Sequence, residues 1–200
     1  ALVGCVAVSM GQIMKYWEYP IKGTGVIQYS QAPYGSIYLE LGQQYNYDNM
    51  PNNYGTDDTS LLLYHCGVSV EMQYGEESSG SFVGFNSQGY DEYYASAENA
   101  FVDHFFYHED IEYICKSNNR PSCSSGIELN DEIWKEEIKN QLDMGLPMIY
   151  VAVDYEMDGC ENGCGHAWNL DGYSNDLFHM NWGWGGYGNG YFALTDLNPE

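Results

Sequence analysis

The sequence predicts an α+β fold, with helices first and antiparallel strands later. Apolar residues recur at helical spacing up to residue 145, and the period changes to that of strands after residue 148. Gly, Asn and Asp separate the later segments, as in hairpin turns. We expect a single domain over residues 1–200, with a helical lobe mainly in 1–145 and a sheet lobe mainly in 146–200.

Helices are predicted for residues 6–17, 57–66, 90–107 and 130–144. Asn130 is a suitable N-cap for the last of these helices, and Gly145 is a suitable stop. Residues 21–60, rich in Tyr, Asn, Gly and Gln, are predicted as loops and short strands. The strands of the second lobe are predicted at residues 148–154, 166–173, 177–184 and 190–194.

The chain is strongly acidic. Six basic and 29 acidic residues give a formal charge of −23, while hydrophobic residues make up 44% of the 200. That apolar content is enough for a core and argues against wholesale disorder. The charge argues against nucleic acid and anionic membrane surfaces as partners, since both attract clustered Lys and Arg. No apolar run approaches the ~20 residues of a spanning helix, so we expect no membrane span.

Four of the six cysteines lie around polar, turn-forming residues. Cys115 and Cys123 bracket one such loop, and Cys160 and Cys164 bracket another. This placement favours disulfides in an oxidising compartment over reduced loop thiols, although the sequence does not choose the pairing. Cys66 lies in an apolar stretch and is predicted as a buried core thiol.

Cys5 is the candidate nucleophile. It follows Gly4 and opens the helix predicted at residues 6–17, where unpaired N–H groups and the positive end of the helix dipole are concentrated. Both favour a thiolate, the reactive form of cysteine. The alternative is that Cys5 is only a small buried residue at the start of a helix.

His166 is the candidate base, because it enters a predicted strand from a glycine turn. Asn181 and Trp182 follow on the next strand, so the order Cys, His, Asn suits a nucleophile, a base and an orienting group. The indoles of the segment 181–186 are expected to shield the histidine from water. On its own this segment would equally suit a sugar-binding surface or a packed sheet end.

The other histidines give weaker signals. His104 and His108 are four residues apart, a spacing that could hold a metal, but the Glu that zinc proteases carry after the first His is missing. His65 is predicted on a helix face and His179 as a packed strand residue. We therefore predict no metal and no cofactor.

The sequence resembles the streptopain-type cysteine peptidases, peptidase family C10, in segments that follow the family's order from the first residues to the last. These segments are Gly4–Ala7, Gln12–Tyr16, Gly67–Gly75, Ser78–Ser81, Gly165–Ala167, Leu170–Gly172, Asn181–Gly186 and Leu197–Pro199. The resemblance implies a papain-like fold with a cleft between its lobes. It also implies a secreted or cell-surface bacterial endopeptidase, made as an inactive precursor.

The resemblance also assigns roles to individual residues. Cys5 matches the nucleophile and His166 the general base, and Trp184 would help to position that histidine, which makes Asn181 less central. The stretch Ser78, Ser79, Gly80, Ser81, together with Gly165, would border the substrate cleft. The expected partners are protein or peptide substrates, with an apolar side chain at the second position before the scissile bond, and the chain's own pro-segment as inhibitor.

Two departures from the family bear on activity. The family's oxyanion-hole glutamine and its C-terminal glycine-rich region fall outside residues 1–200, so we expect a domain trimmed at both ends that is inactive in this form. The sequence leaves two further hypotheses open. One is a surface module without catalysis that binds protein or glycan through the Trp/Gly hairpin. The other is a zinc site at Cys160, Cys164 and His166.

Overall fold

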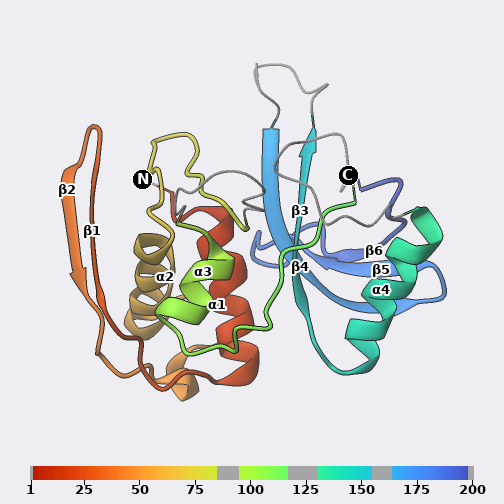
Figure 1. The fold of residues 1–200 in the computed structure, drawn as a ribbon, viewed down its shortest axis with the longest axis horizontal. Helices are drawn as coiled ribbons and strands as arrows, with labels where there is room; N and C mark the ends of the chain where they lie inside the picture. Colours follow the sequence, from red (N-terminus) through yellow and green to blue (C-terminus); the bar gives the residue numbers. More distant parts are fainter. Residues whose placement is uncertain (1, 85–94, 117–129, 155–163, 198–200) are drawn as a thin grey trace. The chain divides into compact units, whose positions relative to one another are not determined.

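The computed structural model describes residues 2–84, 95–116, 130–154 and 164–197 (Figure 1). The chain divides into two compact units, Ala1–Glu128 and Leu129–Glu200. Helices and an antiparallel sheet occur together, as the α+β prediction required. Most of the described helices belong to the first unit, and the larger sheet belongs to the second.

The first unit is built around two packed helices, α1 (Cys5–Trp17) and α2 (Asp57–Ser69). Met10 and Met14 of α1 and Leu62 and Cys66 of α2 are buried. The helices approach closely at Gly11, where an added Cβ would lie 2.6 Å from a methyl group of Leu63. The buried Cys66 thiol, 3.6 Å from the Met14 sulfur, confirms the predicted core cysteine.

A two-stranded hairpin, β1 (Val26–Gln31) and β2 (Gly35–Glu40), covers part of α2 (Figure 1). Its inner residues Ile27 and Tyr29 form a small apolar cluster with Leu41 and with Val68 of α2. A 3-10 turn, η1 (Tyr47–Asn49), and the short helix α3 (Ala97–Asp103) complete the described elements of this unit.

The second unit is a four-stranded antiparallel sheet with one described helix packed on it. Its strands, in spatial as well as sequence order, are β3 (Met148–Asp154), β4 (Cys164–Ser174), β5 (Leu177–Asn181) and β6 (Gly190–Phe192). Helix α4 (Asp131–Asp143) is capped by Asn130, whose Oδ1 accepts from the N–H groups of Glu132 and Ile133, as predicted. Trp134 of α4 donates from Nε1 to the Tyr150 hydroxyl on β3, 3.1 Å away.

Several predicted elements end at other residues in the structure, among them the helix expected at 57–66, which continues to Ser69, and the strand expected at 190–194, which ends at Phe192. Of the helix expected at 90–107, residues 90–94 lie outside the described part, and α3 is the helical portion of the rest. At its start, α3 is capped by Ser96, whose hydroxyl accepts from Asn99 N–H. The helix does not extend to residue 107, because the φ of 59° at Phe106 lies outside the α-helical range. The strand expected at 177–184 ends at Asn181, because Gly183, Gly185 and Gly186 adopt positive φ in a turn.

The two compact units meet between Glu128 and Leu129. Helix α4 packs on β4, so it belongs with the sheet rather than with the other helices. Among the described residues, no helix combines the length and the apolar character needed to cross a membrane.

His65 is a titratable side chain inside the first unit. It is 1% exposed, and its Nδ1 lies 2.9 Å from the Tyr45 hydroxyl. Burial lowers the pKa of His65 to about 4, because the imidazolium would lose its hydration there. A histidine with a lowered native pKa stabilises the fold above its unfolded-state value of 6.5 and progressively less as the pH falls towards 4.

We therefore expect the free energy of unfolding of His65→Gln to depend less on pH between 6.5 and 4 than that of the wild type. The difference across this window should be on the order of 2 kcal/mol, because glutamine accepts from Tyr45 without taking up a proton. Urea unfolding at several pH values measures it. His108→Gln, at an exposed position, is the control, and identical pH slopes for wild type and His65→Gln would contradict the expectation.

Candidate active site

Cys5 is the first residue of α1 and is a half-buried free thiol. The chain enters the helix through Gly4, whose φ of 93° is a conformation that L side chains rarely adopt. A Cβ at Gly4 would also lie 2.6 Å from the Met72 sulfur, so only glycine fits. The first turn of α1 carries no acidic residue, which leaves the positive end of the helix dipole uncompensated within that turn.

His166 lies on β4 and is held by the backbone of the neighbouring turn. Its Nε2 is 2.9 Å from the carbonyl oxygen of Trp182. Because a carbonyl oxygen only accepts, Nε2 carries the proton and donates, and Nδ1 of the neutral ring is left with the lone pair. The ring can therefore take up a proton at Nδ1 without losing its orientation.

Three indoles stack on the imidazole of His166. The ring centroids of Trp184, Trp168 and Trp182 lie 5.0, 5.7 and 6.3 Å from it, at interplanar angles of 26°, 22° and 18°. Trp168 and Trp182 are buried, and Trp184 is 46% exposed, so Trp184 covers the ring at the surface. Burial lowers the pKa of His166, and the hydrogen bond to Trp182 partly opposes this effect.

The acceptor that holds His166 Nε2 is the backbone carbonyl of Trp182. Asn181 Oδ1 accepts from Gly183 N–H, 3.2 Å away, and so shapes the turn after β5. Asn189 Oδ1 likewise accepts from Trp182 N–H at 3.0 Å, and Trp182 Nε1 donates to Gly188 O at 3.0 Å. The two asparagines thus fix the turn that presents the Trp182 carbonyl. Sequence reasoning missed the role of this carbonyl, because every residue type has one.

The residues expected to border a substrate cleft lie in two places. Ser78, Ser79, Gly80 and Ser81 belong to the first unit, and Gly165 is an exposed residue of β4 in the second. The Ser79 hydroxyl donates to Leu2 O at 2.7 Å, and the Ser81 hydroxyl donates to Val70 O. Both hydroxyls therefore contact the protein's own backbone in this structure.

The remaining cysteines and histidines are placed as follows. Cys115 and Cys164 are disulfide-bonded, as predicted, whereas Cys123 and Cys160 lie outside the described residues, so disulfides at these two stay a prediction. A disulfide-bonded Cys164 has no thiolate to offer a zinc ion.

The two histidines with metal-like spacing have separate partners. His104 Nδ1 lies 3.1 Å from Thr24 O, and His108 Nδ1 lies 3.2 Å from Asp110. His179, predicted as a packed strand residue, is paired through Nδ1 with Asp171 and is partly exposed. Among the described residues, no three His, Cys, Asp or Glu side chains group as metal ligands would.

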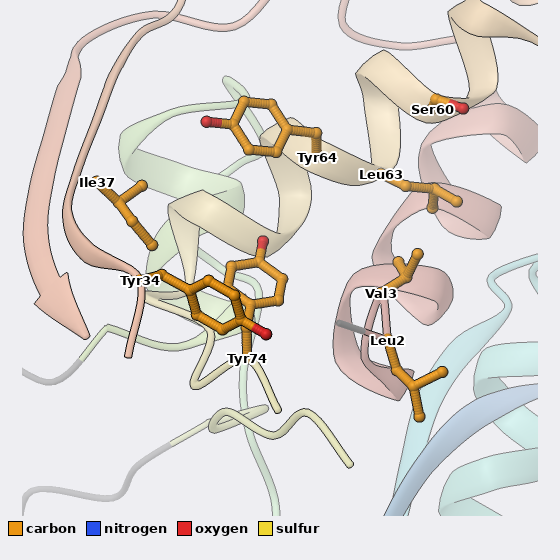
Figure 2. Close-up of a pocket in the computed structure, with 8 residues that line it drawn as sticks. All are labelled: Leu2, Val3, Tyr34, Ile37, Ser60, Leu63, Tyr64 and Tyr74. Atoms are coloured by element: carbon orange, nitrogen blue, oxygen red, sulfur yellow. The ribbon is translucent and has the colours of Figure 1, made fainter. Parts of the chain in front are cut away.

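A pocket of about 390 Å³ lies within the first unit, between the tip of the β1–β2 hairpin, α2 and the segment before Cys5 (Figure 2). Its wall is mostly apolar and is formed by Leu2, Val3, Tyr34, Ile37, Ser60, Leu63, Tyr64 and Tyr74. Neither Cys5 nor His166 is among these residues.

Comparisons with known proteins agree on one family. The sequence profile of the peptidase C10 family matches residues 1–192. The chain is 32% identical over its whole length to the thiol protease/hemagglutinin PrtT of Porphyromonas gingivalis, of which it covers 21%. It is 29% identical over its whole length to streptopain of Streptococcus pyogenes, of which it covers 47%.

A solved structure gives the same result for the fold. Active interpain A, a cysteine protease of Prevotella intermedia, superposes with a TM-score of 0.79 at 31% identity, covering 98% of this chain and 76% of that one. A fragment of prointerpain A from the same organism superposes at 0.73 with 30% identity, covering 99% of this chain and 58% of that one. The chain thus has the papain-like fold of these proteases and spans less than half the length of the curated relatives that it matches.

The shielding of the His166 imidazole from water by Trp184 can be tested without an activity assay. Removal of the indole in Trp184→Ala exposes the imidazole, so the desolvation that lowers the pKa of His166 weakens and this pKa rises. An NMR titration of the ring protons of His166 measures the shift. Trp17→Ala removes a similarly exposed indole (44%) from α1 and should leave that titration unchanged. A His166 pKa that stays constant or falls in Trp184→Ala would refute the shielding.

Proposed function

We propose a function for this chain from one premise: it belongs to the peptidase C10 family. The proposed function is that of a cysteine endopeptidase, in which Cys5 is the nucleophile and His166 the general base. The proposal requires the Cys5 thiol and the His166 imidazole to act together as a thiol–imidazole pair.

The observation that carries the proposal is the pair of local environments. Cys5 is the free thiol at the open N-terminus of α1, and His166 is the histidine whose Nε2 is already held by a carbonyl. One group is a free thiol at a helix N-terminus, and the other has its free nitrogen at Nδ1. These are the two properties that a thiol–imidazole pair needs.

The proposed reaction is acyl transfer in two steps. The Cys5 thiolate attacks the peptide carbonyl carbon, and the electron pair of the C=O bond moves onto oxygen, where the Cys5 N–H donates to it. A second donor, the upstream glutamine implied by the family, would complete the oxyanion hole, each donor contributing ~3 kcal/mol. As the C–N bond breaks, the imidazolium gives its Nδ1 proton to the leaving amine and a thioester remains. Nδ1 then takes a proton from water, the hydroxide attacks the thioester, and the acid and the thiolate are released.

Further features follow from the family and are proposed with it. The substrates are protein chains with an apolar side chain at the second position before the cut, and Ser78–Ser81 and Gly165 border the site that binds them. The protein is secreted or located at the cell surface as a precursor, whose pro-segment inhibits it, and the existence of a pro-form of interpain A supports this part. The disulfide-bonded Cys115 and Cys164 support an oxidising compartment.

Cys5→Ala in the full-length protein should lower the rate of protein hydrolysis by at least about a thousandfold, because the nucleophile is lost. His166→Ala should have an effect of similar size, because the two groups act as a unit. Casein hydrolysis measures both. Cys66→Ala is the matched control, and turnover that persists in Cys5→Ala would overturn the proposal.

Labelling gives an independent test. The epoxide E-64 should add once, at Cys5, and iodoacetamide should modify Cys5 but not Cys66, because burial raises the pKa of the Cys66 thiol. Mass spectrometry of the non-reduced protein should also find Cys115, Cys123, Cys160 and Cys164 in disulfides. Free thiols at these four positions would argue against the proposed compartment.

A further inference from the structure

A short hairpin in the first unit contacts the backbone that leads into Cys5. Gln73 and Gly80 pair across it, with Gln73 N–H donating to Gly80 O at 2.9 Å and Gly80 N–H donating to Gln73 O at 3.2 Å. Its tip, residues 75–79, lies against Leu2. The hairpin is thus the neighbour of the segment just before the candidate nucleophile.

Leu2 is bound to this tip through both of its backbone polar groups. Its N–H donates to Gly75 O at 3.2 Å, and its carbonyl accepts from the Ser79 hydroxyl at 2.7 Å. The same hydroxyl accepts from Gly75 N–H at 3.1 Å. The Ser79 hydroxyl therefore joins the Leu2 carbonyl to the Gly75 N–H: it donates to the first and accepts from the second.

The hairpin also packs against Gly4. A Cβ at Gly4 would meet the Met72 sulfur at 2.6 Å and the Ser79 Cβ at 3.4 Å. Gly4 is directly followed by Cys5, and its φ of 93° sets the direction in which α1 begins. A displacement of the hairpin would therefore move both the Cys5 sulfur and the Cys5 N–H.

The hairpin is itself fixed to β1. The Tyr29 hydroxyl donates to Met72 O at 3.1 Å, and Gln31 Nε2 donates to Tyr74 O. Tyr29 and Gln31 are both buried. A chain of hydrogen bonds therefore runs from β1 through the hairpin and Ser79 to Leu2, three residues before Cys5.

We propose that Ser79 is a positioning residue for Cys5: its hydroxyl fixes the Leu2–Gly4 backbone, and so holds the nucleophile and its N–H in the geometry that acylation requires. The proposal rests on the proposed function of Cys5. It gives the Ser79 hydroxyl a role through its contact with Leu2, within the stretch that was predicted to border the substrate cleft.

The test compares two side chains of nearly the same shape at position 79 in the full-length protein. Ser79→Thr keeps the hydroxyl, and Ser79→Val replaces it with a methyl group, so any crowding against Gly4 is the same in both. In single-turnover reactions with a peptide substrate, the limiting acylation rate of Ser79→Val should fall about 10-fold, since small displacements of a reacting group are costly. The substrate concentration that gives half of the limiting rate should stay within about twofold of the wild-type value. Ser79→Thr should keep the wild-type rate.

A second readout does not involve substrate. The rate at which iodoacetamide modifies Cys5 should also fall in Ser79→Val and be retained in Ser79→Thr. Ser60→Ala is the matched control, because it removes a hydroxyl that donates to a backbone carbonyl at 2.9 Å inside α2, and it should alter neither rate. Thermal unfolding midpoints identify any variant that does not fold.

The outcomes separate this proposal from the proposed function. If Cys5→Ala is inactive while Ser79→Val keeps the wild-type acylation and alkylation rates, the positioning role is overturned and the nucleophile stands. If Ser79→Val changes only the half-saturation concentration, Ser79 contacts substrate and the positioning role is again overturned. Loss of both rates in Ser79→Thr as well as in Ser79→Val would also overturn it, because the hydroxyl would not be the deciding group.

Discussion

The turn at Gly4 is the constraint on which the candidate site depends. A reactive cysteine at the start of a helix needs the N–H groups of the first turn to stay uncapped. The preceding chain must therefore approach from the side of the helix and not along its axis. At this position φ is 93°, and the Met72 sulfur occupies the space where a Cβ would be. The buried face of α1, packed on α2, then fixes the direction of the helix, and the hairpin from Met72 to Gly80 fixes the chain before it.

In the second unit, the main chain fixes the orientation of a histidine, His166. The imidazole is oriented by a backbone carbonyl, and that carbonyl is presented by a glycine turn whose ends are held by Asn181 and Asn189. Backbone groups are effective in this role because they have no rotamers of their own once the turn is fixed. The stacked indoles then limit the water around the ring, which is why the pKa of His166 is lowered although its Nε2–H is satisfied.

Local sequence signals predicted most of the elements and both members of the candidate pair. Helix α1, helix α4 with its Asn130 cap, strand β3 and the buried Cys66 follow from patterns within a few residues. The features that were missed depend on partners far away in the sequence. The end of α3, the place of α4 beside the sheet, the acceptor for His166 and the contact of Ser79 with Leu2 are all set by tertiary packing. A serine in a loop and a carbonyl in a turn carry no local signal for such roles.

Residue type alone does not select the candidate pair, as a second cysteine and histidine, both in the first unit, show. His65 and Cys66 are neighbours in α2, closer in sequence than any other such pair in the chain. Both are fully enclosed: burial lowers the pKa of the imidazole and raises that of the thiol, so each stays neutral at neutral pH. Neutral forms suit a core, where an ion pair would have to offset the loss of hydration of both charges. Cys5 differs in being half-buried at an open helix N-terminus, and His166 in being half-buried with one nitrogen held and one left for a proton. The environment, therefore, makes one cysteine–histidine pair part of the core and leaves the other available for chemistry.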